Sequence, residues 1–390
     1  MDHTLMLEPP SSIADDPPIE ARPARRGRLR RGFAAIVSGW EWLLGAASLL
    51  FGLSILAAFP IAQFLSLGYL LEASGRVARS GRLRDGWIGV RRAGRVGGIV
   101  AGAWLCVLPA RFVASMASSA ELIDPGGPIA RQWWAGLMVL TFLTAVHVAA
   151  GCARGGRLRH FVWPPGTMLW LVRRLRKGGM YVESRDATWE FVRGFRLPYY
   201  LRLGALGFAG AMSWLVVPVV LLASGQRFPL LGILGALGLG FVVPSLSFLQ
   251  ARYAMEGRFA AMFEVRAVRE RFRRAPWAFA LAFFLTVAAA IPLYLLKIEI
   301  VPKEATWLPG LLFVGFLFPA RLACGWAYAR GDRRETPRHW AFRGIGRLGM
   351  LPVLAAYVLI VFLAQYTSWG GLWSLYEQHA FLLPVPFLGY

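Results

Sequence analysis

Long apolar runs alternate with short polar stretches along most of the chain after residue 40. A helix that crosses a bilayer needs about 20 consecutive, mostly apolar residues. Runs of this kind cover roughly residues 43–71, 96–119, 133–153, 200–223, 229–253, 277–297, 308–329 and 348–368. One such run would also suit a buried helix of a soluble protein. About eight in one chain predict an all-α fold, a polytopic transmembrane helix bundle.

Arginine marks every second connection between these runs. The connections after the first, third, fifth and seventh runs are rich in arginine. The alternate connections offer only Arg131, Arg227, Lys297 and Lys303. Because basic loops stay on the cytoplasmic side of a membrane, this pattern predicts a multi-pass protein of the bacterial inner, or cytoplasmic, membrane with its arginine-rich loops inside.

The N-terminal residues 1–32 disagree with a count of eight crossings. They are polar, with six arginines between Arg22 and Arg31, and their composition predicts a disordered basic tail. Eight crossings would place this tail outside, against the rule for basic segments. Either the tail is an exception, or residues 34–71 enter the membrane and return as a broken, re-entrant hairpin around Pro60. Both alternatives stay open at this point.

A spaced motif recurs at the ends of several apolar runs. The first run ends with Pro-x3-Phe-x4-Tyr-x2-Glu, from Pro60 to Glu72, and the fifth run repeats it from Pro244 to Glu256. The seventh run keeps part of it, beginning at Pro319. Nine helical residues rise about 13–14 Å, which places each proline near the middle of the bilayer, where it would kink its helix. The identical spacing predicts a duplication, with two parallel four-helix repeats.

This duplication suggests a division of the chain into four parts. Residues 1–32 are the tail, and residues 33–223 are the first membrane repeat, which includes the cytoplasmic loop 154–199. Residues 224–368 are the second repeat, and residues 369–390 are a C-terminal tail.

Composition strengthens the membrane assignment and narrows the partners. Hydrophobic residues make up 57% of the chain and charged residues only 16%, against about 25% in soluble domains. The net charge is +22. Because the arginines lie between apolar runs, anionic lipid headgroups are the expected partner, and nucleic acid is not. The three cysteines lie inside apolar stretches without metal-ligand spacing and suit packing.

Three polar side chains inside the apolar runs are candidates for an intramembrane site. Arg111 and Arg321 each follow Pro-Ala, and His147 is the only histidine within a run. A buried charge is costly in a bilayer, so it faces protein or water. The arginines would line a cavity for an anionic group, or they would make structural hydrogen bonds. His147 is typical of a helix–helix hydrogen-bond partner, and Gly98-x3-Gly102 predicts a close helix approach.

The loop 154–199 contains the clearest surface feature. Four apolar residues fall at i, i+3, i+4 and i+7, and three basic residues lie on the far side. The apolar set is Met168, Leu171, Val172 and Leu175, and the basic set is Arg173, Arg174 and Lys177. This spacing predicts a basic amphipathic helix that lies in the inner interface and contacts anionic lipid.

The run that ends Leu67-Gly68-Tyr69-Leu70, followed by a basic loop and then Gly97-Gly98, resembles an uncharacterised prokaryotic family of multi-pass membrane proteins of unknown function. That family is similar in layout to the membrane domain beside some glycerophosphodiester phosphodiesterases. The resemblance covers about residues 40–300. The chain departs from it at Arg252, where the family has glycine before the tyrosine. The resemblance carries over no catalytic residues.

The sequence contains no catalytic motif. HExxH, a P-loop, Gly-x-Ser-x-Gly and paired carboxylates within a run are all absent, so we expect no enzymatic activity, cofactor or metal. The expected function is a non-enzymatic membrane protein that organises lipids or partner proteins. The alternative is a transporter or permease subunit for an anionic solute or lipid, which would work with a separate ATPase or another membrane subunit.

Overall fold

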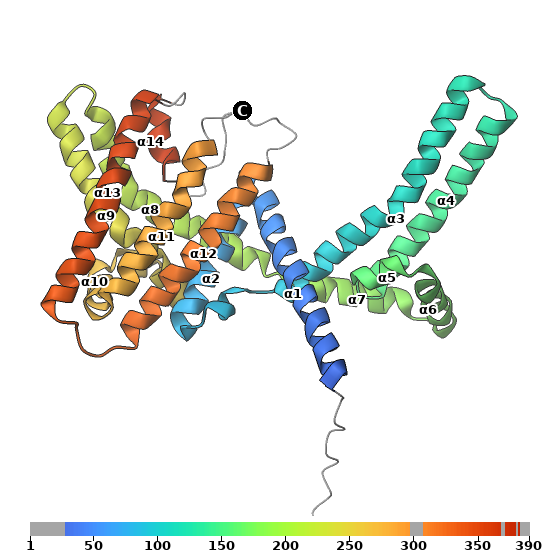
Figure 1. Ribbon diagram of the computed structural model, residues 1–390, viewed down its shortest axis with the longest axis horizontal. Coiled ribbons are helices and arrows are strands. Elements are labelled where there is room, and N and C mark those ends of the chain that lie inside the picture. Colours follow the sequence, from blue (N-terminus) through green and yellow to red (C-terminus); the bar gives the residue numbers. More distant parts are fainter. Residues whose placement is uncertain (1–27, 297–306, 368–370, 380, 383–390) are drawn as a thin grey trace, which may run out of the picture. The chain divides into compact units, whose positions relative to one another are not determined.

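The computed structural model describes residues 28–296, 307–367, 371–379 and 381–382 (Figure 1). The chain divides into two compact units, Met1–Trp40 and Glu41–Tyr390. In the first unit the described residues, from Arg28 onward, are helical. The predicted tail 1–32 therefore lies mostly outside the described residues, and its last part already belongs to a helix.

Every regular element in the described residues is a helix. The long helices are α1 Arg28–Ala57, α2 Gln63–Ser80, α3 Val90–Ile123, α4 Pro128–Ala153, α8 Leu197–Ser224, α9 Pro229–Glu256, α11 Pro276–Leu296, α12 Trp307–Asp332 and α13 Trp340–Thr367 (Figure 1). The short ones are α5 Leu158–Val162, α6 Pro164–Lys177, α7 Met180–Arg193, α10 Val265–Arg274 and α14 Ser374–Glu377, with 3-10 helices at Leu83–Gly86, Phe259–Phe263 and Gly371–Trp373.

Length and composition make this a multi-pass membrane protein. Seven of the described helices are long and apolar enough to cross a bilayer, and the bent pair α10–α11 raises the number to eight. Prolines begin α4, α9 and α11, where the missing N–H is not needed because the first turn of a helix has no intrahelical acceptor for it. The predicted all-α polytopic bundle is confirmed.

The first apolar run is broken rather than continuous. α1 ends at Ala57 and α2 begins at Gln63, with Pro60 in the turn between them. The Gln63 side chain donates a hydrogen bond to the carbonyl of Pro60 over 2.6 Å and so fixes this turn. The proline predicted to kink a helix here separates two helices, whereas Pro244 and Pro319 lie inside α9 and α12.

α2 runs parallel to α12. Tyr69 of α2 stacks on Phe318 of α12, with 6.1 Å between the ring centroids. Further along both helices, the Ser74 carbonyl lies against Gly325. The residue numbers of the contacts therefore rise together along the two helices.

The part of α1 that belongs to the second unit, from Glu41 onward, runs antiparallel to α12. Trp42 packs against Trp87 at 5.1 Å, and Trp87 packs in turn on Phe318 at 4.6 Å. Later in α1, the carbonyl of Ser54 lies against Gly310, near the start of α12. Since α1 is antiparallel to α12 and α2 is parallel to it, α1 and α2 form a broken hairpin. This is the second of the two alternatives that the sequence leaves open.

The helices α2, α8, α9, α11, α12 and α13 pack together, and we call this group the main bundle. α2 is its central helix and packs against α8, α9 and α12. Its crossing with α8 is very close, because a Cβ atom at Gly204 would lie 1.9 Å from the carbonyl oxygen of Phe64. The core joins residues from both predicted repeats, among them Leu70 and Leu246. Packing therefore runs across the boundary predicted at residues 223 and 224.

The two copies of the motif end in similar turns. Gly81 and Gly257 adopt left-handed backbone conformations with φ of 69° and 71°, and each N–H donates to the carbonyl of the residue four positions earlier. Glycine suits this position because it lacks a Cβ atom. A 3-10 helix follows each turn after Arg82 and Arg258. A duplicated unit would produce this likeness, and the duplication itself stays a prediction.

Adding one methyl group tests the close crossing of α2 and α8. We expect Gly204→Ala to lower the free energy of unfolding by about 1–3 kcal/mol, because the added Cβ forces the two backbones apart. Gly136→Ala is the matched control, since a Cβ at Gly136 meets nothing within 4 Å. Thermal unfolding in detergent, followed by tryptophan fluorescence, measures both. Equal midpoints for the two variants would contradict the crossing.

The broken hairpin makes a topological prediction. A reporter fused ahead of Arg28 and reporters inserted at Gly179 and Arg334 should all report the same side of the membrane, while one at Gly126 should report the other. If α1 and α2 formed a single crossing, the reporter ahead of Arg28 would instead agree with the one at Gly126. Alkaline phosphatase and green fluorescent protein fusions distinguish the two sides.

Candidate functional site

The three polar residues predicted to form an intramembrane site lie in separate places. Arg111 is exposed on α3, His147 is buried on α4 and Arg321 is buried on α12. No contact among the described residues joins any two of them. Each must therefore be interpreted by its own neighbours.

Arg321 is held inside the main bundle by neutral acceptors. Its side chain is 3% exposed, and it donates hydrogen bonds to the Gln250 side-chain oxygen and, over 2.9 Å, to the carbonyl of Phe381. Gln250 then donates to the carbonyl of Leu382 over 3.0 Å. No carboxylate pairs with Arg321 among the described residues, and the acceptors that the described structure gives it are a backbone carbonyl and a side-chain amide.

One acceptor of Arg321, the carbonyl of Phe381, belongs to the described part of the C-terminal segment, residues 371–379 and 381–382. This segment is buried at Ser374, Leu375 and Phe381. The hydroxyl of Tyr357 on α13 bonds to the ring of His379, and the same tyrosine packs against Phe381 with 5.4 Å between centroids. The described part of the region predicted as a C-terminal tail thus packs into the bundle, and Arg321 contacts it there through the carbonyl of Phe381.

His147 fixes the turn that follows its own helix. Its Nε2 lies 2.9 Å from the carbonyl oxygen of Phe161, so Nε2 carries the donated proton. The Phe161 ring is 2% exposed and fills the space left by two glycines, since a Cβ at Gly102 would lie 2.3 Å and one at Gly151 would lie 2.8 Å from the ring. The close approach predicted for Gly98-x3-Gly102 is therefore made to this turn.

Sequence reasoning missed a carboxylate network at the end of α2. Glu72 is 4% exposed and accepts hydrogen bonds from Arg76 over 3.0 Å, from Arg79 over 2.9 Å and from the Tyr199 hydroxyl over 2.7 Å. Arg79 also donates to the carbonyl of Ala254, near the end of α9. The network joins α2 to α8 and α9.

A second network surrounds Arg252 near the end of α9. The Arg252 side chain donates to the Tyr328 hydroxyl over 3.0 Å and pairs with Glu256 at 2.9 Å and with Glu264. The available signals in the sequence were the i,i+4 spacing of the charges and the place of both Glu72 and Glu256 at the end of the repeated motif. The arginine that departs from the family pattern is therefore a structural ion-pair partner.

The predicted amphipathic helix is present as α6. Val172 and Leu175 on its apolar side are 47% and 58% exposed, and Arg173 and Lys177 are exposed as well. Arg174 forms an ion pair with Glu183 of α7, which continues the surface. We call the outer sides of Pro164–Lys177 and Met180–Arg193 the α6–α7 surface.

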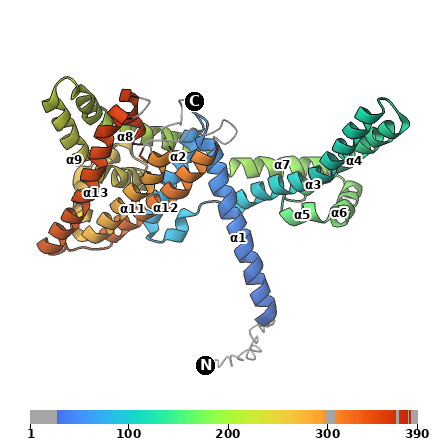
Figure 2. The same cartoon turned by 45° about the horizontal axis from the view of Figure 1, so that its top comes forward.

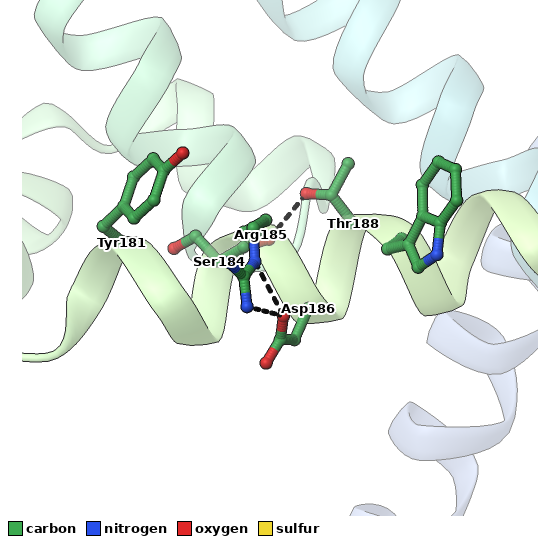
Figure 3. Close-up of a pocket in the computed structure, with 6 residues that line it drawn as sticks. Tyr181, Ser184, Arg185, Asp186 and Thr188 are labelled. Carbon is green, nitrogen blue, oxygen red and sulfur yellow. Dashed lines mark hydrogen bonds and ion pairs between the residues drawn. The ribbon is translucent and has the colours of Figure 1, made fainter.

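α7 carries polar and aromatic groups along one side. A shallow groove is lined by Tyr181, Ser184, Arg185, Asp186, Thr188 and Trp189 (Figure 3). In Figure 3 the Arg185 and Asp186 side chains pair with each other, at 2.9 Å. The aromatic residues are well exposed, Tyr181 at 77% and Trp189 at 57%. Exposed tyrosine and tryptophan beside charges are typical of the headgroup level of a bilayer.

Comparison of the chain with protein-family models, with curated proteins and with solved structures finds no match. The resemblance to an uncharacterised prokaryotic membrane family stays a prediction. Among the residues that the structure describes, no group of three or more His, Cys, Asp or Glu could hold a metal ion.

Replacing Arg321 tests its role as the anchor of the C-terminal segment. We expect Arg321→Met to lower the free energy of unfolding by about 3 kcal/mol or more, because two hydrogen bonds to a charged group contribute about 1.5–3 kcal/mol each. Amide hydrogen exchange around Leu375 should also become faster. Arg111→Met, on an exposed position, should change the free energy of unfolding by less than about 0.5 kcal/mol. Unchanged exchange at Leu375 in the Arg321 variant would argue against the anchor.

Proposed function

We propose that this protein is a non-enzymatic protein of the cytoplasmic membrane that binds and organises anionic lipid at its arginine-rich side. The observation that carries the proposal is the α6–α7 surface. It presents apolar and aromatic side chains to the outside directly beside arginine and lysine.

The place of this surface in the chain supports the proposal. α5 and α6 lie between α4 and the helical stretch Tyr181–Ser224, which joins α7 to α8. Both α4 and this stretch are long and apolar enough to cross a bilayer. Short helices between two crossings lie at the membrane surface, where an apolar side enters the headgroup layer and cations meet anionic lipid. Each basic residue near such a surface contributes about 1 kcal/mol.

The broken hairpin of α1 and α2 removes the conflict over orientation. If α1 and α2 enter and leave on one side, the arginines before α1 share that side with the basic connections after α2, α4, α9 and α12. Basic segments remain in the cytoplasm, so the arginine-rich side would face the anionic inner leaflet. All the basic connections then obey one rule.

Transport of an anionic solute or lipid has less support. Arg321 donates hydrogen bonds to Gln250 and to the C-terminal segment. Arg111 lies exposed on another helix. The two arginines do not line a common pathway. The separate ATPase or membrane subunit that transport would need stays a prediction.

Lipid enrichment tests the proposed function. The protein is purified in nanodiscs that contain equal amounts of phosphatidylcholine and phosphatidylglycerol, and the lipids retained after delipidation are counted by native mass spectrometry. We expect the wild type to retain phosphatidylglycerol and the triple variant Arg173→Gln/Arg174→Gln/Lys177→Gln to retain several-fold less, because the attraction of these basic residues to the anionic headgroup is lost.

The control removes the same charge from another basic helix. Arg266→Gln/Arg269→Gln/Arg273→Gln removes three charges from α10, outside the α6–α7 surface. This control should keep most of the retained phosphatidylglycerol. Equal retention by the wild type and the α6 variant, or equal loss in both variants, would refute a specific role of the α6–α7 surface.

A further inference from the structure

A basic pocket lies at the foot of the hairpin formed by α3 and α4, which run side by side in Figures 1 and 2. The pocket is formed by α3, the end of α4, α5 and α6. Its lining residues are Arg95, Arg154, Gly155, Arg157, Arg159, His160 and Trp170. Four of these seven residues are arginines, and none is acidic.

The four arginines have no carboxylate partner among the described residues. The ion pairs between described residues involve other arginines, such as Arg76, Arg174 and Arg252. Like charges gathered around one space repel each other and produce a positive potential inside it. A bound anion would remove this repulsion.

His160 adds a buried polar atom that lacks a partner. The residue is 7% exposed, and its Nδ1 has no hydrogen-bond partner in the described structure. Burial, together with Arg154, Arg159 and Arg157, lowers the pKa of His160 to about 4. The ring is therefore neutral at pH 7. In the Nδ1–H tautomer an unpaired donor is therefore buried in the wall of the pocket, and leaving such a group unpaired costs about 1–3 kcal/mol.

Two glycines and three side-chain hydrogen bonds shape the backbone of the pocket. Gly155 and Gly156 have φ of 113° and 64°, values at which a side chain would be strained. The Thr167 hydroxyl donates to the carbonyl of His160 over 2.6 Å, and Arg154 donates to the same hydroxyl over 3.3 Å. Together with the bond from His147 to the carbonyl of Phe161, these contacts hold the turn in place. A turn fixed in this way needs little ordering when a ligand binds.

We propose that this pocket binds the phosphate group of an anionic ligand, either a phospholipid headgroup or a free phosphate. The planar guanidinium group of arginine donates two parallel hydrogen bonds to phosphate oxygens. The space of about 430 Å³ leaves room for the glycerol of a lipid next to its phosphate. The lipid source rests on the proposed function, whereas binding of free phosphate does not.

The experiment uses the full chain in nanodiscs of pure phosphatidylcholine. Isothermal titration calorimetry measures binding of inorganic phosphate in one series and of soluble dihexanoyl phosphatidic acid in another, both at 0.15 M salt. Arg157→Gln/Arg159→Gln should weaken binding at least tenfold. Arg157→Lys/Arg159→Lys keeps the charge but loses the guanidinium geometry, and should restore only part of the affinity.

The matched control is Arg266→Gln/Arg269→Gln, which removes two charges from α10, outside the pocket. It should bind within about twofold of the wild type. Thermal unfolding of every variant checks folding, and the exposed positions of Arg157 and Arg159 make these variants suitable for that check. His160→Phe gives a second test, because it removes the unpaired donor and keeps the arginines.

The outcomes decide whether the pocket binds phosphate and whether that phosphate is free or part of a lipid headgroup. Saturable binding of inorganic phosphate that the Arg157/Arg159 variant loses supports a free phosphate site. Saturable binding of phosphatidic acid alone supports a headgroup site. No saturable binding of either ligand, or equal weakening in the α10 control, overturns the pocket. Phosphatidylglycerol retention through α6 would then still stand, so failure of the pocket is distinguishable from failure of the proposed function.

Discussion

The main bundle depends on the close approach of its helices to α2. This helix is shorter than its neighbours and ends in charged residues, yet α8, α9 and α12 all pack against it. Approach at this distance is only possible where Cβ atoms are missing, and glycines stand at the crossings: Gly68 and Gly204 between α2 and α8, Gly75 against α9, and Gly325 against α2. In a bilayer, where lipid tails are as apolar as the helices, such contacts and the hydrogen bonds between helices are the main forces for association. The central place of α2 follows from them.

The same packing explains why charged residues are tolerated within the bundle. The polar end of α2 brings Glu72 to Arg79 and Tyr199, and the matching end of α9 brings Arg252 to Glu256 and Tyr328. Each charge finds an opposite charge or a hydroxyl close by, which limits the penalty of leaving water. These networks join helices that are far apart in the sequence, and they hold the ends of α2, α8 and α9 at one level.

The sequence predicts the class of fold well, since apolar length and arginine spacing depend only on local composition. It also predicts α6 and the approach at Gly98 and Gly102. The direction of α2 could not be settled, because an apolar run of this length with a proline in it suits either one bent crossing or two short helices. The partner of Arg321 could not be predicted either, since Gln250 and the carbonyl of Phe381 lie 71 and 60 residues away and carry no charge pattern. His147 bonds to a neighbouring helix, but its acceptor is a backbone carbonyl of the short helix α5, which the apolar pattern does not predict.

The arginines fall into two groups that differ in their partners. Arg252 and Arg321 are buried in the bundle and Arg79 is exposed near the end of α2, and each has carboxylate, hydroxyl or carbonyl acceptors that account for its place. Arg157 and Arg159 have no carboxylate partner among the described residues and share one space with two further arginines and an unpaired imidazole nitrogen. Charges of the first kind are fixed by the fold and stabilise it. Charges of the second kind repel one another in the folded chain, so the fold keeps them together at a cost that only a bound anion would offset. The difference in partners therefore separates structural arginines from those that we propose bind a ligand.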